Sequence, residues 1–249
     1  MKKLLFACDM DNTLIYSHRH PHEGWECVEW IQGREQSFVS PETKRGLLRL
    51  SSRLTPVAVT SRTVRQYLRL EMPVPMGLAL TGNGADLLAE GCPDEAWRTE
   101  TDALIAPWRE EMRRCQAQLE DAEGVLHVAV ADDAYLYAVF PDASEAARRA
   151  GTLESKTDLA VVASGRKLYL LPPPLNKGRA VRRLMEWKGY TRLIAAGDSP
   201  LDLPMLCMAD TAIAPHGLRG FLPAHARTSP EGELFSRFVV QTVLDCLGK

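Results

Sequence analysis

The sequence predicts an α/β fold, with a Rossmann-like core on a parallel sheet and an inserted α+β cap domain. Two observations predict it. At both ends of the chain, short apolar runs alternate with amphipathic segments, the order of strands and helices in a parallel sheet with crossover connections. Between these ends the order changes to helix, two strands, helix and two strands, which indicates a separate layer.

The N-terminal half of the core begins with a short, continuous apolar run at residues 4–8. Such a run is typical of a central parallel strand that is covered on both faces. Residues 41–52 carry leucines beside basic residues and predict an amphipathic helix, with Ser40 as N-cap and Pro41 in its first turn. The remaining elements of this half are a strand at 56–60, a helix at 64–70 and a strand at 78–81.

The rest of the chain separates into an insertion and a second half of the core. The insertion has a helix at 102–120, strands at 125–130 and 135–140, a helix at 143–154 and a hairpin of 159–163 with 167–171. The core then resumes with a helix at 177–187, a strand at 193–196, a helix at 201–208, a strand at 211–214 and a helix at 233–247. We therefore divide the chain into a core of residues 1–81 and 176–249 and a cap domain of residues 82–175, which ends at a stiff triple proline.

Composition excludes several classes of protein. The 249 residues include 30 Lys and Arg against 32 Asp and Glu, a net charge of −2 that argues against nucleic acid or an anionic membrane as a main partner. No apolar run reaches the roughly 18 residues that a membrane-spanning helix needs. Six scattered cysteines without a CxxC pair indicate reduced thiols in a cytoplasmic protein. The oligomeric state stays open.

Carboxylates follow two of the predicted core strands. Asp9 and Asp11 follow the first strand and are two residues apart in the sequence. If the extended geometry of the strand continues, their side chains point to the same side. Asp198 and Asp202 follow the strand at 193–196. Because ligands bind at the carboxyl ends of parallel strands, these groups are expected to share one crevice. Like charges that are packed together need a cation or a proton to compensate them.

Two further segments offer partners for an anion. Thr60, Ser61 and Arg62 follow the second strand and present hydroxyl and backbone N–H groups at a strand-to-helix turn. Asn176 is a suitable N-cap for the next helix, but Lys177 in its first turn opposes the helix dipole. A lysine in this unfavourable place indicates an anion to hold. Taken alone, the first segment is better explained as a simple Ser/Thr helix cap, and a surface lysine stays a reasonable explanation of the second.

The order of the four segments resembles that of the haloacid dehalogenase-like (HAD) hydrolase superfamily. The resemblance covers residues 4–14, 56–62, 176–180 and 193–202, and its most specific part is Asp9-x-Asp11-x-Thr13-Leu14. The insertion looks like the class II cap of Cof-type and sugar-phosphate phosphatases. Asn83, in the sequence Thr-Gly-Asn-Gly-Ala at the start of the insertion, resembles a segment of the Cof-like members and is expected to contact substrate.

The resemblance implies a phosphatase that works through an aspartyl-phosphate. Asp9 would be the nucleophile, and Asp11 would act first as general acid and then as general base. It further implies substrate contacts and Mg²⁺ ligands. The expected phosphate and substrate contacts are Thr60, Ser61, Arg62, Asn83 and Lys177, and the expected Mg²⁺ ligands are Asp9, the backbone carbonyl of Asp11, Asp198 and, in a supporting role, Asp202. The expected substrate is a small phosphorylated metabolite, such as a sugar or polyol phosphate.

One position departs from the family pattern. Cof-like relatives usually carry Asn immediately before the last Asp of the fourth motif, and this chain has Leu201. A polar contact near the metal is therefore missing or comes from another residue, for example Ser199.

The segment between residues 14 and 40 is expected to form a flap over the site. Residues 27–31 and 36–39 are its predicted hairpin arms, with Gln32 and Gly33 in the turn. His18, His20 and His22 alternate in this segment, but no Cys or His partner at zinc spacing accompanies them, so exposed loop residues are the favoured interpretation. Trp25 and Trp30 either contact substrate or simply pack.

Two alternatives to a phosphatase remain open at this point. A phosphomutase or phosphotransferase uses the same aspartyl-phosphate, and the core motifs do not distinguish these reactions. A phosphorylatable signalling module also combines acidic residues, a hydroxyl and a lysine around Mg²⁺. The long insertion before Lys177 and the order of the motifs disfavour the signalling module. A catalytically inactive binding protein is disfavoured because each assigned position holds a competent residue.

Overall fold

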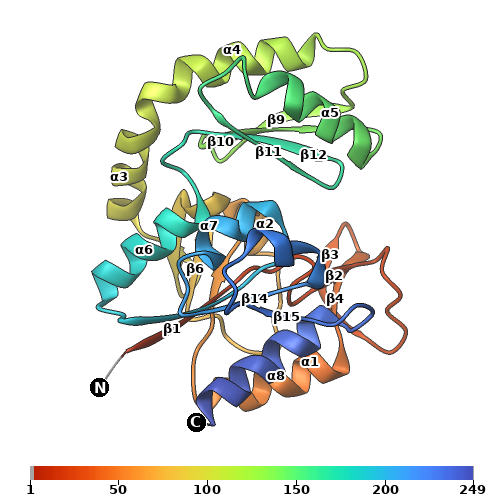
Figure 1. The fold of residues 1–249 in the computed structure, drawn as a ribbon, viewed down its shortest axis with the longest axis vertical. Helices are drawn as coiled ribbons and strands as arrows, with labels where there is room; N and C mark the ends of the chain where they lie inside the picture. Colours follow the sequence, from red (N-terminus) through yellow and green to blue (C-terminus); the bar gives the residue numbers. More distant parts are fainter. Residues whose placement is uncertain (1–2, 249) are drawn as a thin grey trace.

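The computed structural model describes residues 3–248 and consists of a large core with a smaller cap above it (Figure 1). The core contains the strands β1 (Leu4–Cys8), β5 (Val57–Val59), β6 (Leu78–Thr81), β7 (Asp86–Ala89), β8 (Cys92–Pro93), β13 (Arg192–Ala196), β14 (Thr211–Ala214) and β15 (Arg227–Thr228). Its helices are α1 (Pro41–Ser51), α2 (Val64–Tyr67), α6 (Lys177–Lys188), α7 (Leu203–Leu206) and α8 (Phe235–Leu247). The α/β class predicted from the sequence is confirmed.

The core sheet has the order β15-β14-β13-β1-β5-β6-β7-β8. All pairs from β15 to β6 are parallel, whereas β7 and β8 are antiparallel additions at one edge. These two edge strands were not predicted. They lie after residue 81, where we place the domain boundary, and they pair with the core sheet. The division into core and cap stays a prediction, and this pairing favours a later start for the cap.

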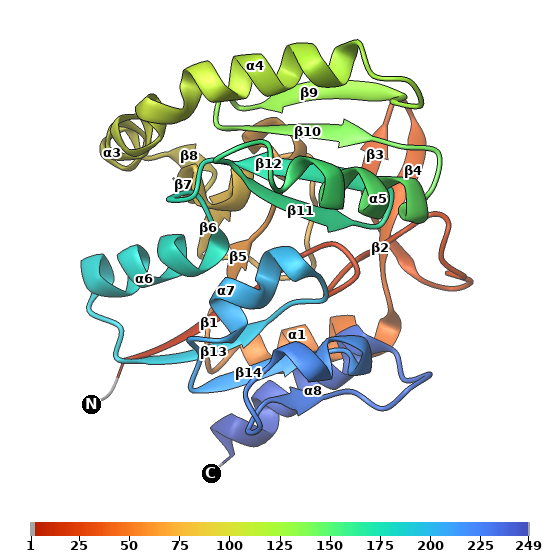
Figure 2. The same cartoon turned by 45° about the horizontal axis from the view of Figure 1, so that its top comes forward.

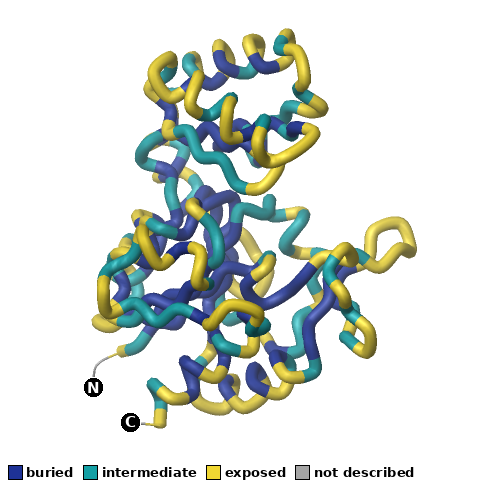
Figure 3. Tube along the Cα trace, turned by 45° about the vertical axis from the view of Figure 1, so that its right-hand side comes forward, coloured by how far each residue is buried: buried dark blue, intermediate teal, exposed yellow. Residues whose placement is uncertain are grey.

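Helices cover both faces of the core sheet. Successive side chains of β1 point to opposite faces of the sheet, and both faces are covered, which explains why the strand is apolar throughout. Phe6 and Cys8 pack toward α1 and α8, whereas Leu5 and Ala7 pack toward α6 and α7. All four side chains are at most 1% exposed. Figure 3 shows that buried residues concentrate in these central strands. The predicted N-cap of α1 is also confirmed, since Ser40 accepts a hydrogen bond from the Thr43 N–H.

The cap is an antiparallel sheet with helices on its outer face (Figure 2). Its sheet has the order β11-β12-β10-β9, and its elements are α3 (Glu95–Ile105), α4 (Arg109–Glu120), β9 (His127–Ala131), β10 (Tyr135–Val139), α5 (Ala143–Leu153), β11 (Ala160–Ser164) and β12 (Lys167–Leu171). The single helix predicted over 102–120 is wrong in detail. A short 3₁₀ turn containing Pro107 separates α3 from α4, because proline supplies no N–H to continue the helix.

A third sheet forms the flap that the sequence predicts. It has the order β2-β4-β3 and consists of β2 (Tyr16–Ser17), β3 (Glu26–Ile31) and β4 (Arg34–Val39). The predicted turn residues Gln32 and Gly33 both have positive φ angles, 53° and 74°. In the described residues, no helix is both long enough and apolar enough to cross a lipid bilayer.

The cap contacts the core through an apolar cluster and several hydrogen bonds. Leu201 belongs to this cluster and is 8% exposed, so the leucine that replaces the expected asparagine packs against the cap. The Tyr135 hydroxyl donates to the Ser61 carbonyl at 2.6 Å, and the Val64 N–H donates to Asp132 at 2.8 Å. These contacts hold the cap over the carboxyl ends of the core strands.

Candidate active site

Asp9 lies at the centre of the core sheet, one residue beyond β1. Its N–H donates to the Ala196 carbonyl at 2.9 Å, which extends the pairing of β1 with β13 and sets the direction of its side chain. The following turn is closed by N–H groups of Thr13 and Leu14, which donate to the Met10 carbonyl, and Asn12 adopts a φ of 56° in it. The Asp9 side chain is consequently held at a fixed place with little exposure.

Lys177 connects the carboxylates of two different loops. Lys177 is the first residue of α6 and is 2% exposed. Its Nζ donates to Oδ1 of Asp9 and to Oδ1 of Asp202, both at 2.6 Å. The other oxygen of Asp202 accepts from the N–H groups of Asp198 and Ser199 and from the Ser199 hydroxyl. Asp202 therefore shapes the loop after β13, and Ser199 supplies a polar contact there, as the sequence suggested.

Burial and charge act in opposite directions on these groups. Burial raises the pKa of Asp9 well above its usual range, although Lys177 acts to lower it. Burial, aided by the negative charge of Asp202, raises the pKa of Asp198 to about 6. Burial alone would lower the pKa of Lys177, but Asp202 and Asp9 together raise it above its ordinary value. The lysine therefore stays charged and compensates both carboxylates.

Three carboxylates are close enough to share one cation. Oxygen atoms of Asp9, Asp198 and Asp202 all lie within 4.8 Å of one another. Both oxygens of Asp202 already have donors. Among residues 3–248, by contrast, the Thr13 hydroxyl is the one side-chain donor to Asp9 Oδ2 and Asp198 Oδ1, at 3.4 and 3.3 Å. Asp9 and Asp198 thus retain oxygen atoms for a metal. Hard oxygen donors of this kind fit Mg²⁺.

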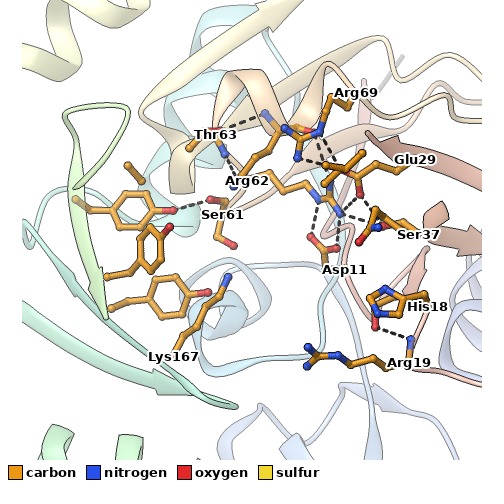
Figure 4. A pocket seen from close by; sticks show the side chains of 18 residues that line it. Asp11, His18, Arg19, Glu29, Ser37, Ser61, Arg62, Thr63, Arg69 and Lys167 are labelled. Atoms are coloured by element: carbon orange, nitrogen blue, oxygen red, sulfur yellow. Dashed lines mark hydrogen bonds and ion pairs between the residues drawn. The ribbon is translucent and has the colours of Figure 1, made fainter. Parts of the chain in front are cut away.

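Asp11 lies outside this group of three. Its carboxylate accepts two hydrogen bonds of 2.8 Å from the guanidinium of Arg62, a bidentate pair that Figure 4 shows beside the cavity. Arg62 also donates to both oxygens of Glu29 in the flap, at 2.9 and 3.0 Å. Sequence reasoning assigned Arg62 to the substrate, but in this structure two carboxylates occupy its donors.

Glu29 was not found from the sequence. It is 2% exposed and accepts further hydrogen bonds from Ser37 at 2.7 Å and from Arg69 at 3.1 Å. Burial acts to raise its pKa, but the hydrogen bonds from Arg62 and Ser37 outweigh this and hold the pKa below the ordinary value. A glutamate in a hairpin arm carries no local signal of such a role, because its partners come from other parts of the chain.

Thr60 and Asn83, two of the residues predicted to contact substrate, are buried below the surface of the site. Thr60 is fully buried, and its hydroxyl accepts from the Arg62 N–H at 3.1 Å. The Asn83 N–H donates to the Thr60 carbonyl at 2.9 Å, which brings these two predicted residues together. Asn83 is 1% exposed, and its amide has no hydrogen-bond partner within residues 3–248. Ser61 is more accessible and lines the cavities described next.

Two adjoining cavities separate the core from the cap. The larger, of about 890 Å³, is lined by Asp9, Asp11, Lys177 and Asp198 on the core side and by the turn between β11 and β12 on the cap side. The smaller, of about 340 Å³, lies between the flap, Arg62 and three tyrosines of the cap (Figure 4). Asp11 lines both cavities.

Two of the three histidines of the flap segment take part in packing. The ring of His20 stacks on Trp25 at a centroid distance of 5.2 Å, and that of His22 stacks on Phe38 at 3.9 Å. His18 lines the smaller cavity, and its side chain is visible at the edge of Figure 4. Trp30, which we considered as a substrate contact, is 41% exposed.

Comparison with known proteins identifies the fold. No family model and no curated protein sequence matches the chain. The sucrose-phosphatase of Synechocystis sp. PCC6803 superposes with a TM-score of 0.66 at 15% identity, covering 98% of this chain and 99% of that one. The sugar phosphatase BT4131, described as HAD subclass IIB, gives 0.64 at 13% identity and 99% coverage of both chains. A haloacid dehalogenase-like hydrolase from Bacteroides thetaiotaomicron gives 0.53 at 17% identity, covering 98% and 100%. At these identities the likeness concerns the fold, and it confirms the HAD-like core and cap.

Proposed function

We propose that this chain, which has the HAD fold, is a Mg²⁺-dependent phosphatase that hydrolyses a small phosphorylated metabolite through an aspartyl-phosphate. One observation carries the proposal: the buried Asp9 carboxylate is bound by Lys177 and lies within 4.8 Å of the oxygens of Asp198 and Asp202. A carboxylate nucleophile, a fixed cation and a set of hard oxygen ligands meet the needs of phosphoryl transfer, which depends mainly on positioning and charge stabilisation. The descriptions of the sucrose-phosphatase and of BT4131 support a sugar or polyol phosphate as the substrate class.

In the first step, an oxygen of Asp9 attacks phosphorus, and the bond from phosphorus to the leaving oxygen breaks. Lys177 holds the Asp9 carboxylate in place and offers its positive charge to the phosphoryl oxygens. The buried loop around Asp9 limits the movement of the nucleophile, so little reorganisation is needed at the moment of attack. Asp9 and Asp198 would hold the Mg²⁺, which supplies further positive charge for the phosphoryl group when bound.

Asp11 serves as the acid and the base in this scheme. A proton passes from its carboxyl group to the leaving alkoxide, and the resulting carboxylate then accepts a proton from the water that attacks the aspartyl-phosphate. This attack breaks the bond between phosphorus and Asp9 and releases inorganic phosphate. For the first transfer, a carboxyl oxygen of Asp11 must turn from Arg62 toward the substrate. The Arg62–Asp11 pair thus holds the acid beside the larger cavity.

Release of inorganic phosphate from a panel of phosphorylated metabolites and from p-nitrophenyl phosphate tests the proposal. We expect activity with Mg²⁺, loss of activity with a chelator, and a roughly thousandfold or larger fall in kcat for Asp9→Asn. Asp121→Asn, at an exposed position of the cap, is the matched control and should keep full activity. Mass spectrometry of acid-quenched enzyme should find one phosphoryl group on Asp9. Full activity of Asp9→Asn would disprove the mechanism.

A further inference from the structure

Three cationic side chains of the larger cavity have no use in the chemistry described so far. They are Arg19, from the loop after β2, Arg166, from the turn between β11 and β12, and Lys167, the first residue of β12. Among residues 3–248, no carboxylate forms an ion pair with any of them. Arg166 donates to the Phe140 carbonyl at 2.9 Å, and the Lys167 ammonium lies 5.4 Å from the centre of the Tyr137 ring.

The acidic side chains that line the two cavities are already compensated. Asp9 pairs with Lys177, Asp11 pairs with Arg62, and Glu29 pairs with both Arg62 and Arg69. Asp198 remains, and it belongs to the set of oxygens proposed for the metal. The three cations are therefore an excess of positive charge in the cavity. An excess of this kind attracts anions and is complementary to an anionic ligand.

Two of the three cations come from the cap, whereas the reacting carboxylate belongs to the core. Phosphorus must come within bonding distance of Asp9 on the core, whereas Arg166 and Lys167 belong to the cap. Figure 4 shows Lys167 on the cap side of the adjoining cavity and Arg19 on the side of the loop after β2. A cavity of about 890 Å³ is large enough for a whole metabolite, of which the phosphoryl group fills only one end.

We propose that the substrate carries a second anionic group, a carboxylate or a second phosphoryl group, which Lys167, Arg166 and Arg19 bind at the cap side of the cavity. This inference rests on the proposed function, because that function places the reacting phosphoryl group at Asp9. Arg19, Arg166 and Lys167 are all exposed, so their charges are accessible to a ligand that enters the cavity. A neutral sugar would offer these three cations no charged partner.

Two matched pairs of substrates test the proposal. 6-Phosphogluconate and sorbitol 6-phosphate differ only in a carboxylate against a hydroxymethyl group at the far end, and fructose 1,6-bisphosphate and fructose 6-phosphate differ in a second phosphoryl group. We expect kcat/KM to be roughly tenfold or more higher for at least one anionic member, as charge-assisted hydrogen bonds imply. Preference in the first pair identifies a carboxylate as the second anion, and preference in the second pair identifies a phosphoryl group.

Variants of the cap separate this role from a general attraction of phosphate. Lys167→Gln should reduce the preference for the anionic member about tenfold, while kcat/KM for its neutral counterpart changes by less than about threefold. Arg148→Gln removes an exposed arginine on α5 and should leave the preference intact. Equal kcat/KM within both pairs, or an equal loss for both members in Lys167→Gln, would overturn the proposal.

Binding measurements keep the two proposals distinguishable. Isothermal titration of the same four compounds into Asp9→Asn with Mg²⁺ measures affinity without turnover. If the wild type hydrolyses neither these compounds nor any member of the metabolite panel nor p-nitrophenyl phosphate, the proposed phosphatase activity fails. Tighter binding of an anionic member, lost in Lys167→Gln, would still support the second anion site. Equal binding of all four compounds would refute it.

Discussion

Replacing Lys177 by methionine removes the charge that compensates two buried carboxylates. The side chain is 2% exposed and donates to Asp9 and Asp202 at 2.6 Å. Methionine has a similar length and fills the same space, so the substitution tests charge rather than packing. Removing one partner of a buried ion pair costs about 3–5 kcal/mol, which lowers the melting temperature of a chain of this size by roughly 6–20 °C.

The loss of stability should depend on pH with a definite sign. Without Lys177, the pKa of Asp9 in the folded protein rises further above its unfolded value, because the charge that opposes the effect of burial is gone. Between the two pKa values the folded state then binds more protons than the unfolded state, so stability falls as the pH rises through this interval. The variant should therefore be destabilised more at about pH 8 than at about pH 5.

Thermal unfolding at these two pH values, followed by circular dichroism, measures the effect. Lys156→Met, at an exposed position, is the control for the loss of one lysine. The double variant Lys177→Met/Asp202→Asn removes one of the two uncompensated charges and should recover about half of the lost stability, without recovering activity. A fall in melting temperature below about 2 °C, or a larger fall at the lower pH, would refute this account of Lys177.

Three further predictions concern the flap, the metal and the packing of α6. Glu29→Gln should cost about 1–3 kcal/mol at neutral pH. In the folded protein the pKa of Glu29 lies below the ordinary 4.5, so the difference in stability between the variant and the wild type should vanish as the pH falls through that folded pKa. Acid denaturation measures this difference, and the exposed Glu35→Gln is the control. Mg²⁺ affinity, measured by isothermal titration, should fall as the pH drops below about 6, where Asp198 takes up a proton, and Asp198→Asn should bind Mg²⁺ weakly at every pH. Gly178→Ala should destabilise the fold by about 1–3 kcal/mol, since the added Cβ would lie 2.4 Å from a carbonyl oxygen of α7. Chemical denaturation measures this loss, and Gly217→Ala, whose added Cβ has no atom within 4 Å, is the control that should leave the stability unchanged.

Elements with a local signal were predicted well. The apolar run of β1, the Ser40 cap of α1 and the flap hairpin all depend on neighbouring residues, and the structure contains each of them. The edge strands β7 and β8 were missed although β5, β6 and β14 are about as short. The predicted strands belong to the alternation of strands and helices in the core, whereas β7 and β8 follow β6 without a helix and form by antiparallel pairing with β6 and with each other.

The sequence alone determined the α/β class, the insertion and the grouping of Asp9, Lys177 and Asp198, because each follows a strand or opens a helix at the same edge of a parallel sheet. Which charge pairs with which was decided by tertiary structure. Lys177 is 168 residues from Asp9, and Arg62 is 33 residues from Glu29. Ion pairs of this kind depend on distances that exist only after folding. For the same reason, only the folded chain places the uncompensated cations of the cap opposite Asp9.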